Sequence, residues 1–145
     1  MTEVFNLGAE LGAAGAYGLV GIVLMAAGYG AVDLLTPGQL GQLVYVDRNR
    51  NAAILVASGA LATGIIVTTS ILTSESELGL GVGLVSALVY GLLGVVLLAV
   101  SFVVVDLLTP GKLGEIVTDE HPHPAVYVTA ASHIAVGAIV AASIS

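Results

Sequence analysis

Three ionisable residues stand where they could do chemistry in or beside a membrane. Asp33 and Asp106 each end a long apolar run, and His133 lies in the middle of another. A pair of carboxylates at the mouth of a pathway would attract cations, and an ionisable side chain in mid-membrane is a candidate for proton transfer. The alternatives are structural: span-end carboxylates in headgroup water paired with a nearby cation, and a neutral histidine with one hydrogen-bonded partner.

The remaining polar patterns give no reaction. His121 and His123, beside Asp119 and Glu120, could hold a divalent metal weakly, but a single His-x-His in a solvated loop is a poor signal and we predict no metal. The chain has no cysteine, which excludes disulfides and thiolate sites. It also lacks a nucleophile elbow, a phosphate-binding loop and a zinc-protease motif. We therefore predict no catalytic residues, no cofactor and no enzyme activity.

The composition is that of a protein that lives in lipid. Hydrophobic residues make up 57% of the 145 residues, charged residues 9%, and the mean hydropathy is +1.07. A soluble domain carries roughly 25% charged residues. The net charge of −7 argues against nucleic acid as a partner, because nucleic-acid binders need clustered cations.

Four apolar runs are long enough to cross a bilayer, which takes about 20 residues. They cover residues 11–32, 52–72, 84–105 and 125–144. The first has no positively charged segment before it, so we expect a retained span and not a signal peptide. The sequence thus predicts an all-α integral membrane protein with four transmembrane helices and the lipid bilayer as its surroundings.

The chain contains one unit written twice. The segment from Asp33 to Gly38 recurs from Asp106 to Gly111, an offset of 73, and by count 29 of the 69 residue pairs at this offset are identical. We predict two tandem two-span repeats, 1–74 and 75–145, forming one membrane domain. Each unit crosses twice, so the repeats are parallel, and we expect a two-fold axis along the membrane normal to relate them.

Each unit carries its own link between spans. A helix-stop motif begins each link, because proline cannot continue the helix hydrogen bonds and glycine permits the turn; its residues are Thr36, Pro37, Gly38, Thr109, Pro110 and Gly111. Apolar residues at helical spacing then predict a short amphipathic turn. Asn51 is predicted as the N-cap of the returning helix, with Pro124 at the equivalent place.

The positive charges indicate an orientation. Arg48 and Arg50 lie in the first link and Lys112 in the second, and these are all the Lys and Arg residues of the chain. Because cytoplasmic loops carry the excess of cations, we predict both links inside and both termini outside. Small residues recur in the spans, as in Gly12, Gly15, Gly18 and Gly21, and such faces favour close helix packing. Packing within one chain is the first interpretation; faces left over from it would join copies, and we expect a homo-oligomer.

Taken together, these residues resemble the YjfL-like inner membrane proteins, catalogued as domain of unknown function 350. The matching motifs are Leu35-Thr36-Pro37, Asn51-Ala52-Ala53 and Gly64, with Leu108-Thr109-Pro110 and Gly137 in the second unit; Pro124-Ala125-Val126 departs from the pattern. The resemblance implies a multi-pass inner (plasma) membrane protein without an assigned reaction, and some family members are associated with envelope-stress membrane proteins.

Two functional hypotheses follow. The leading one is a small, non-enzymatic, homo-oligomeric assembly or scaffold element of the cell envelope, because the segments outside the spans are too short for a soluble enzyme or receptor domain. The alternative is a channel or transporter subunit for a small cation or proton, passing Asp33 and Asp106. A dry, Leu/Val-lined centre would favour the scaffold, and a polar centre would favour conduction.

Overall fold

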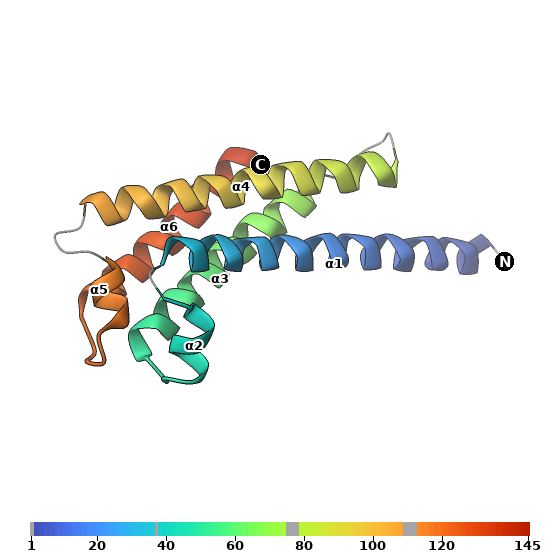
Figure 1. The fold of residues 1–145 in the computed structure, drawn as a ribbon. Helices are drawn as coiled ribbons and strands as arrows, with labels where there is room; N and C mark the ends of the chain where they lie inside the picture. Colours follow the sequence, from blue (N-terminus) through green and yellow to red (C-terminus); the bar gives the residue numbers. More distant parts are fainter. Residues whose placement is uncertain (1, 37, 75–78, 109–112) are drawn as a thin grey trace.

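The computed structural model describes residues 2–36, 38–74, 79–108 and 113–145, and its regular elements are all α-helices. They are α1 (Thr2–Leu35), α2 (Leu40–Tyr45), α3 (Arg50–Leu72), α4 (Leu80–Leu108), α5 (Leu113–Thr118) and α6 (Ala125–Ile144). Helices α1, α3, α4 and α6 are long and α2 and α5 are short. Figure 1 shows α2 and α5 at the same end of the bundle. The predicted all-α class is confirmed.

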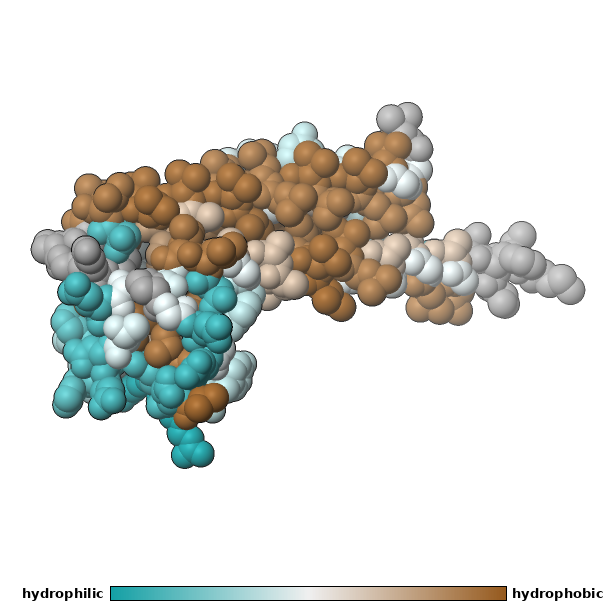
Figure 2. Space-filling view, viewed as in Figure 1, coloured by the Kyte–Doolittle hydropathy of each residue, from teal (hydrophilic) through white to brown (hydrophobic). Residues whose placement is uncertain are grey.

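The four long helices are the predicted spans. Each contains a stretch long and apolar enough to cross a membrane: Leu7–Leu35, Arg50–Leu72, Leu80–Leu108 and Ala125–Ile144. At 1.5 Å per residue, the 20-residue α6 is about 30 Å long, which matches a bilayer core. In Figure 2 hydrophobic residues cover the long helices, and hydrophilic residues gather at the end formed by the two links.

The order of the elements repeats along the chain. A long helix, a short helix and a second long helix follow one another as α1, α2 and α3, and again as α4, α5 and α6. Figure 1 shows α1 and α4 running in the same direction.

The predicted two-fold axis between the halves is wrong. Helix α3 packs against α1, α4 and α6, whereas over the described residues α6 makes no comparable contact with α1. A two-fold would pair α6 with α1 in the same way as it pairs α3 with α4. The similar sequences of the two units give them the same direction in the membrane. They do not require the two units to contact each other through the same surface.

Close helix approach in this bundle depends on glycine. A methyl group added at Gly137 of α6 would lie 2.7 Å from the Cα atom of Ala62 on α3. One added at Gly28 of α1 would lie 2.5 Å from the side chain of Thr63. Helices in lipid gain their association energy from such close packing. Gly28 and Gly137 therefore fix how near α1 and α6 come to α3.

The space between the helices is filled by apolar side chains. One buried cluster, near the links, joins Val32, Leu40, Ala52, Leu55, Phe102 and Val117. A second, farther along the spans, joins Ala62, Ile66, Leu98, Val140 and Ala141. The bundle core between these clusters holds the polar pair described next.

Candidate functional site

A buried polar contact joins α3 to α6 in the interior of the bundle. His133 of α6 is 2% exposed and Ser58 of α3 is 3% exposed. The hydroxyl of Ser58 lies 3.2 Å from Nδ1 of His133. The imidazole ring also stacks on Phe102 of α4, with 4.9 Å between the ring centroids. Three helices therefore meet at His133.

The hydrogen bonds determine the tautomer of His133. Ser58 Oγ donates its single proton to the carbonyl oxygen of Leu55, at 2.8 Å. It must then accept from His133, so Nδ1 carries the proton and Nε2 is an acceptor. Within the described part of the chain Nε2 is buried and has no hydrogen-bond partner. This arrangement suits a neutral histidine that ties two helices together, the structural alternative to proton transfer.

Asn51 is not the N-cap of the returning helix, contrary to the prediction. Helix α3 begins at Arg50, and Asn49 is the cap, because its Oδ1 accepts from the backbone N–H of Ala52 at 3.0 Å. The prediction placed the cap two residues late because both residues are asparagines at the same helix start. Pro124 does occupy the N-cap position of α6.

Asn51 instead fastens the first unit to the link of the second. Its side chain is 2% exposed. Its Nδ2 donates its two protons among three carbonyl oxygens, those of Ile116 at 3.1 Å, Asp119 at 3.1 Å and His121 at 2.8 Å, so that one N–H is shared between two of them. Its Oδ1 accepts from the backbone N–H of His123 at 3.1 Å. One buried carboxamide thus contacts four backbone groups of the second link.

No equivalent pair of asparagines ties the second unit to the link of the first. Asn49 adds a bond from its Nδ2 to the carbonyl oxygen of Asp119, at 2.9 Å. The residues 73 positions after Asn49 and Asn51 are Pro122 and Pro124, which lack an amide side chain. The sequence shows that the second unit lacks these asparagines. It does not show that Asn51 of the first unit binds the second link.

Asp33 caps its own link. Its Oδ1 accepts from the backbone N–H of Leu40, the first residue of α2, at 2.8 Å. A carboxylate there satisfies a helix N–H that otherwise lacks a partner. Asp106 is half-buried at the equivalent place near the end of α4. The span-end aspartate of the first unit therefore has a structural task at the link.

The structure describes part of the helix-stop motif, at Thr36 and Gly38. The hydroxyl of Thr36 donates to the carbonyl oxygen of Val32 at 2.8 Å, and Gly38 adopts a φ of +93°, which favours glycine. Pro37, Thr109, Pro110 and Gly111 lie outside the described residues.

The histidines of the second link have separate partners. Nδ1 of His121 lies 3.3 Å from Oδ1 of Asp119, and Nδ1 of His123 accepts from the backbone N–H of Ala125 at 3.2 Å. The backbone N–H of His121 also donates to Oδ1 of Asp119, at 2.9 Å, and this bond in particular lowers the pKa of the Asp119 carboxyl. Among the described residues no three His, Asp or Glu side chains converge on a point where a metal could bind.

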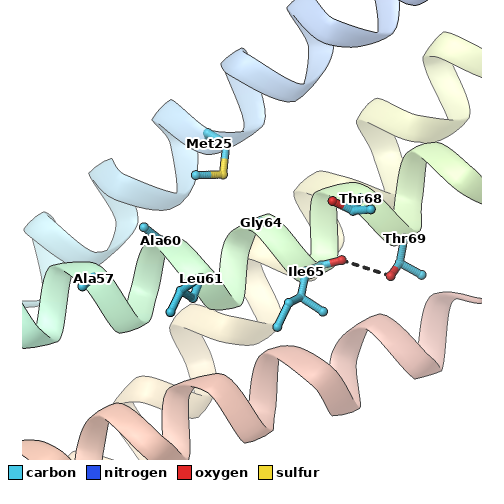
Figure 3. A pocket seen from close by; sticks show the side chains of 8 residues that line it. All are labelled: Met25, Ala57, Ala60, Leu61, Gly64, Ile65, Thr68 and Thr69. Carbon is cyan, nitrogen blue, oxygen red and sulfur yellow. Dashed lines mark hydrogen bonds between the residues drawn. The ribbon is translucent and has the colours of Figure 1, made fainter.

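An open groove runs along the outer surface of α3 and was not predicted. It measures about 720 Å³ and is lined by Met25, Ala57, Ala60, Leu61, Gly64, Ile65, Thr68 and Thr69. Figure 3 shows Met25 projecting from α1 above it and the other residues on α3. The hydroxyl of Thr69 donates to the carbonyl oxygen of Ile65 at 3.0 Å. This groove presents mainly small and apolar side chains and is suited to another helix or a lipid chain.

The comparisons with known proteins agree with the family resemblance. The family model described as Domain of Unknown Function (DUF350) matches residues 6–144. A UPF0719 transmembrane protein of Mycolicibacterium paratuberculosis is 42% identical over 129 residues, covering 89% of this chain and 84% of that relative. A UPF0719 transmembrane protein of Mycobacterium bovis is 39% identical over the same shares of the two chains. No solved structure matches. The chain therefore belongs to the DUF350 family of transmembrane proteins.

Proposed function

We propose that this protein is a non-enzymatic assembly element of the cell membrane that acts as a homo-oligomer. One observation carries the proposal. Several span glycines have no atom from elsewhere in the described part of the chain within 4 Å of where a side chain would begin; they are Gly12, Gly15, Gly18 and Gly64. In this same bundle Gly91, Gly94 and Gly137 each receive a side chain from a neighbouring helix. We infer that helices of a second copy pack against these unfilled glycines.

The interior supports an assembly role over conduction through a single chain. Both core clusters are apolar, and the groups facing the centre include Leu55, Ile66 and Leu98. A cation would have to cross this region without water or charged partners, which is costly. Asp33, the acid expected at a pathway mouth, is engaged by the backbone of Leu40.

The test measures association and ion flux on the same purified protein. Single-molecule photobleaching in supported bilayers at low protein density is expected to show more than one copy per spot, and native mass spectrometry from mild detergent more than one chain. Liposomes holding the protein are expected to pass no more Na⁺, K⁺ or H⁺ than empty ones. Monomers under both conditions would refute the assembly role, and flux above empty liposomes would favour the channel alternative.

We also propose that the two links face the cytoplasm and both termini face outward. The two links lie at one end of the bundle (Figure 1), and every Lys and Arg of the chain lies in a link. The chain has no native cysteine, so a single cysteine at position 2 or 48 reports its side directly. A membrane-impermeant maleimide should label position 2 in intact cells and leave position 48 unlabelled; the reverse pattern would invert the orientation.

A further inference from the structure

We infer that copies of this chain join head to tail: the outer face of α6 and α4 of one copy docks on the groove of α3 and α1 of the next. The contact repeats the one that joins the two units within the chain. The inference rests on the proposed homo-oligomer and specifies how its copies meet. Unit 1 here means residues 4–72 and unit 2 residues 77–145, with equivalent positions 73 apart.

The contact between the two units is one-sided. In four places a side chain of unit 1 fills the space above a glycine of unit 2: Tyr17 at Gly83, Leu24 at Gly91, Ile66 at Gly94, and Ala62 at Gly137. Ser58 of unit 1 likewise reaches His133 of unit 2. Unit 1 supplies the projecting side chains and unit 2 the recesses.

The reverse contacts are missing. A self-complementary interface would also place Leu97 at Gly18 and Ala135 at Gly64, yet no atom of another described segment lies within 4 Å of the side-chain position of either glycine. Leu97 is 39% exposed, and Ile139, the equivalent of Ile66, is 67% exposed. Within the described residues, a recessed face on unit 1 and a projecting face on unit 2 therefore have no counterpart.

A contact within each unit shows that the comparison of equivalent positions is sound. Gly21 lies 3.6 Å from a methyl carbon of Val67, measured from the side-chain position of the glycine, and its equivalent Gly94 lies 3.5 Å from Val140. This contact within a unit occurs in both halves. Among the described residues, the contacts between units occur in one direction only, from side chains of unit 1 to glycines of unit 2.

The groove of Figure 3 lies on unit 1, and the equivalent surface of unit 2 is buried against unit 1. Its residues Met25, Ala60 and Gly64 correspond to Leu98, His133 and Gly137. In unit 2, Leu98 is 4% exposed and His133 is 2% exposed, and Gly137 is buried against Ala62.

The projecting face of unit 2 is likewise exposed, whereas the equivalent face of unit 1 is buried. On α6, Val128 and Ile139 are 69% and 67% exposed, whereas their equivalents Leu55 and Ile66 on α3 are 1% and 0% exposed. Each face thus matches one that is buried inside the chain.

Most residues of closest contact are the same in both units. Three of the four glycine contacts involve residues that are identical at the equivalent position: Leu24/Leu97, Gly18/Gly91, Ile66/Ile139, Gly21/Gly94, Ala62/Ala135 and Gly64/Gly137. The fourth changes, because Tyr17 corresponds to Tyr90 but Gly83 to Glu10, and the polar pair changes too, since Ser58 corresponds to Ala131 and His133 to Ala60. The docking surface between copies is therefore apolar except near Glu10, and a second copy is the partner whose shape is already present in the molecule.

Because one face meets a different face, each copy leaves a new free face for the next. Such interfaces close into rings or grow as open rows. All units cross the membrane in the same direction, so the assembly would lie in the membrane plane.

The test is cross-linking between two differently labelled single-cysteine chains. Ala60→Cys and Ala131→Cys stand at the equivalents of His133 and Ser58, whose side chains approach to 3.2 Å. Mixed in one membrane and oxidised, the two chains should form a disulfide heterodimer, and neither alone should form a homodimer. The double variant should give a ladder of higher oligomers. Ser58→Cys with His133→Cys in one chain, bridging internally, shows that the geometry permits oxidation.

A blocking variant and its control complete the test. Gly64→Leu should abolish the heterodimer and lower the photobleaching count toward one, because the side chain would occupy the place of the neighbour's Ala135. Gly30→Leu, which has equally open space in the chain and whose equivalent Val103 is 41% exposed, should change neither.

The outcomes separate this inference from the function it rests on. Homodimers of either single variant would show a self-complementary interface and overturn head-to-tail docking. Oligomers by photobleaching without the heterodimer would also overturn it, leaving the assembly role intact and the groove to lipid or another protein. Monomers throughout would overturn both.

Discussion

Ser58 and His133 stand 75 residues apart in sequence and make a buried side-chain hydrogen bond, 3.2 Å long, between the two halves of the molecule. The serine accepts from Nδ1–H because its own proton is held by the carbonyl oxygen of Leu55. This geometry makes the imidazole a neutral tie between α3 and α6, with its ring against Phe102.

Breaking this bond should cost little, and removing the ring should cost more. We expect Ser58→Ala to lower the free energy of unfolding by about 0.5–1.5 kcal/mol, in the range of hydrogen bonds between transmembrane helices. His133→Ala also leaves a cavity and should cost about 2–4 kcal/mol. A double-mutant cycle by steric trapping in bicelles should give a coupling of about 0.6–1.7 kcal/mol; additive effects would show that the contact contributes nothing.

Asn51 should matter more than other amides at this end of the molecule. Asn51→Ala removes the partner of four backbone groups of the second link, and we expect a loss of about 2–3 kcal/mol. Proteolysis within residues 116–123 should accelerate, because the link is no longer fastened to α3. The matched control is Gln42→Ala, an exposed amide on α2, which should change both by little; equal effects would contradict the role of Asn51.

Substitutions at Asp33 distinguish a carboxylate that caps a helix from one that attracts cations. Asp33→Ala should destabilise by about 1 kcal/mol, since the N–H of Leu40 loses its acceptor. Asp33→Asn keeps an oxygen at that position and should retain most of the stability. Cation flux in liposomes should equal that of empty vesicles for all three proteins. A flux in the wild type that falls with Asp33→Asn would instead assign the charge to conduction.

The second link should loosen in acid through Asp119. Hydrogen bonds from His121 hold the pKa of the Asp119 carboxyl below its usual 3.8. A lowered pKa in the folded state adds stability that is fully present above the unfolded value and is lost as the pH falls through the folded value. The amide NMR signal of His121 should therefore titrate with a midpoint below 3.8. Asp119→Asn should remove this transition, and a midpoint at or above 3.8 would contradict the assignment.

Some of the site could be predicted because its cause is local. Asp33 could be singled out because it ends an apolar run and has its equivalent in Asp106, whereas its role as acceptor for the first N–H of α2 is seen only in the structure. His133 was singled out because charges are rare in apolar runs. Its partner could not be predicted, since a serine in a helix gives no signal of which distant helix it faces.

The asparagines show the same limit. A cap at the start of α3 was predicted, but Asn49 fills that position and Asn51 binds the second link, 65 to 72 residues away. Both side chains suit a helix start by their chemistry. Only the arrangement of the link around α3 decides which of them turns inward.

By itself, the sequence determined the four apolar spans, the duplicated links and their common direction, because hydropathy, proline and glycine act within a few residues. Only the tertiary structure decided which faces meet: Ala62 against Gly137, with Gly64 left open. Helix packing in lipid is set by the fit of small and large side chains between helices and not by hydrophobicity, which is similar on all their faces. Two nearly equal units could therefore meet by a two-fold or head to tail, and a periodic apolar sequence does not distinguish the two.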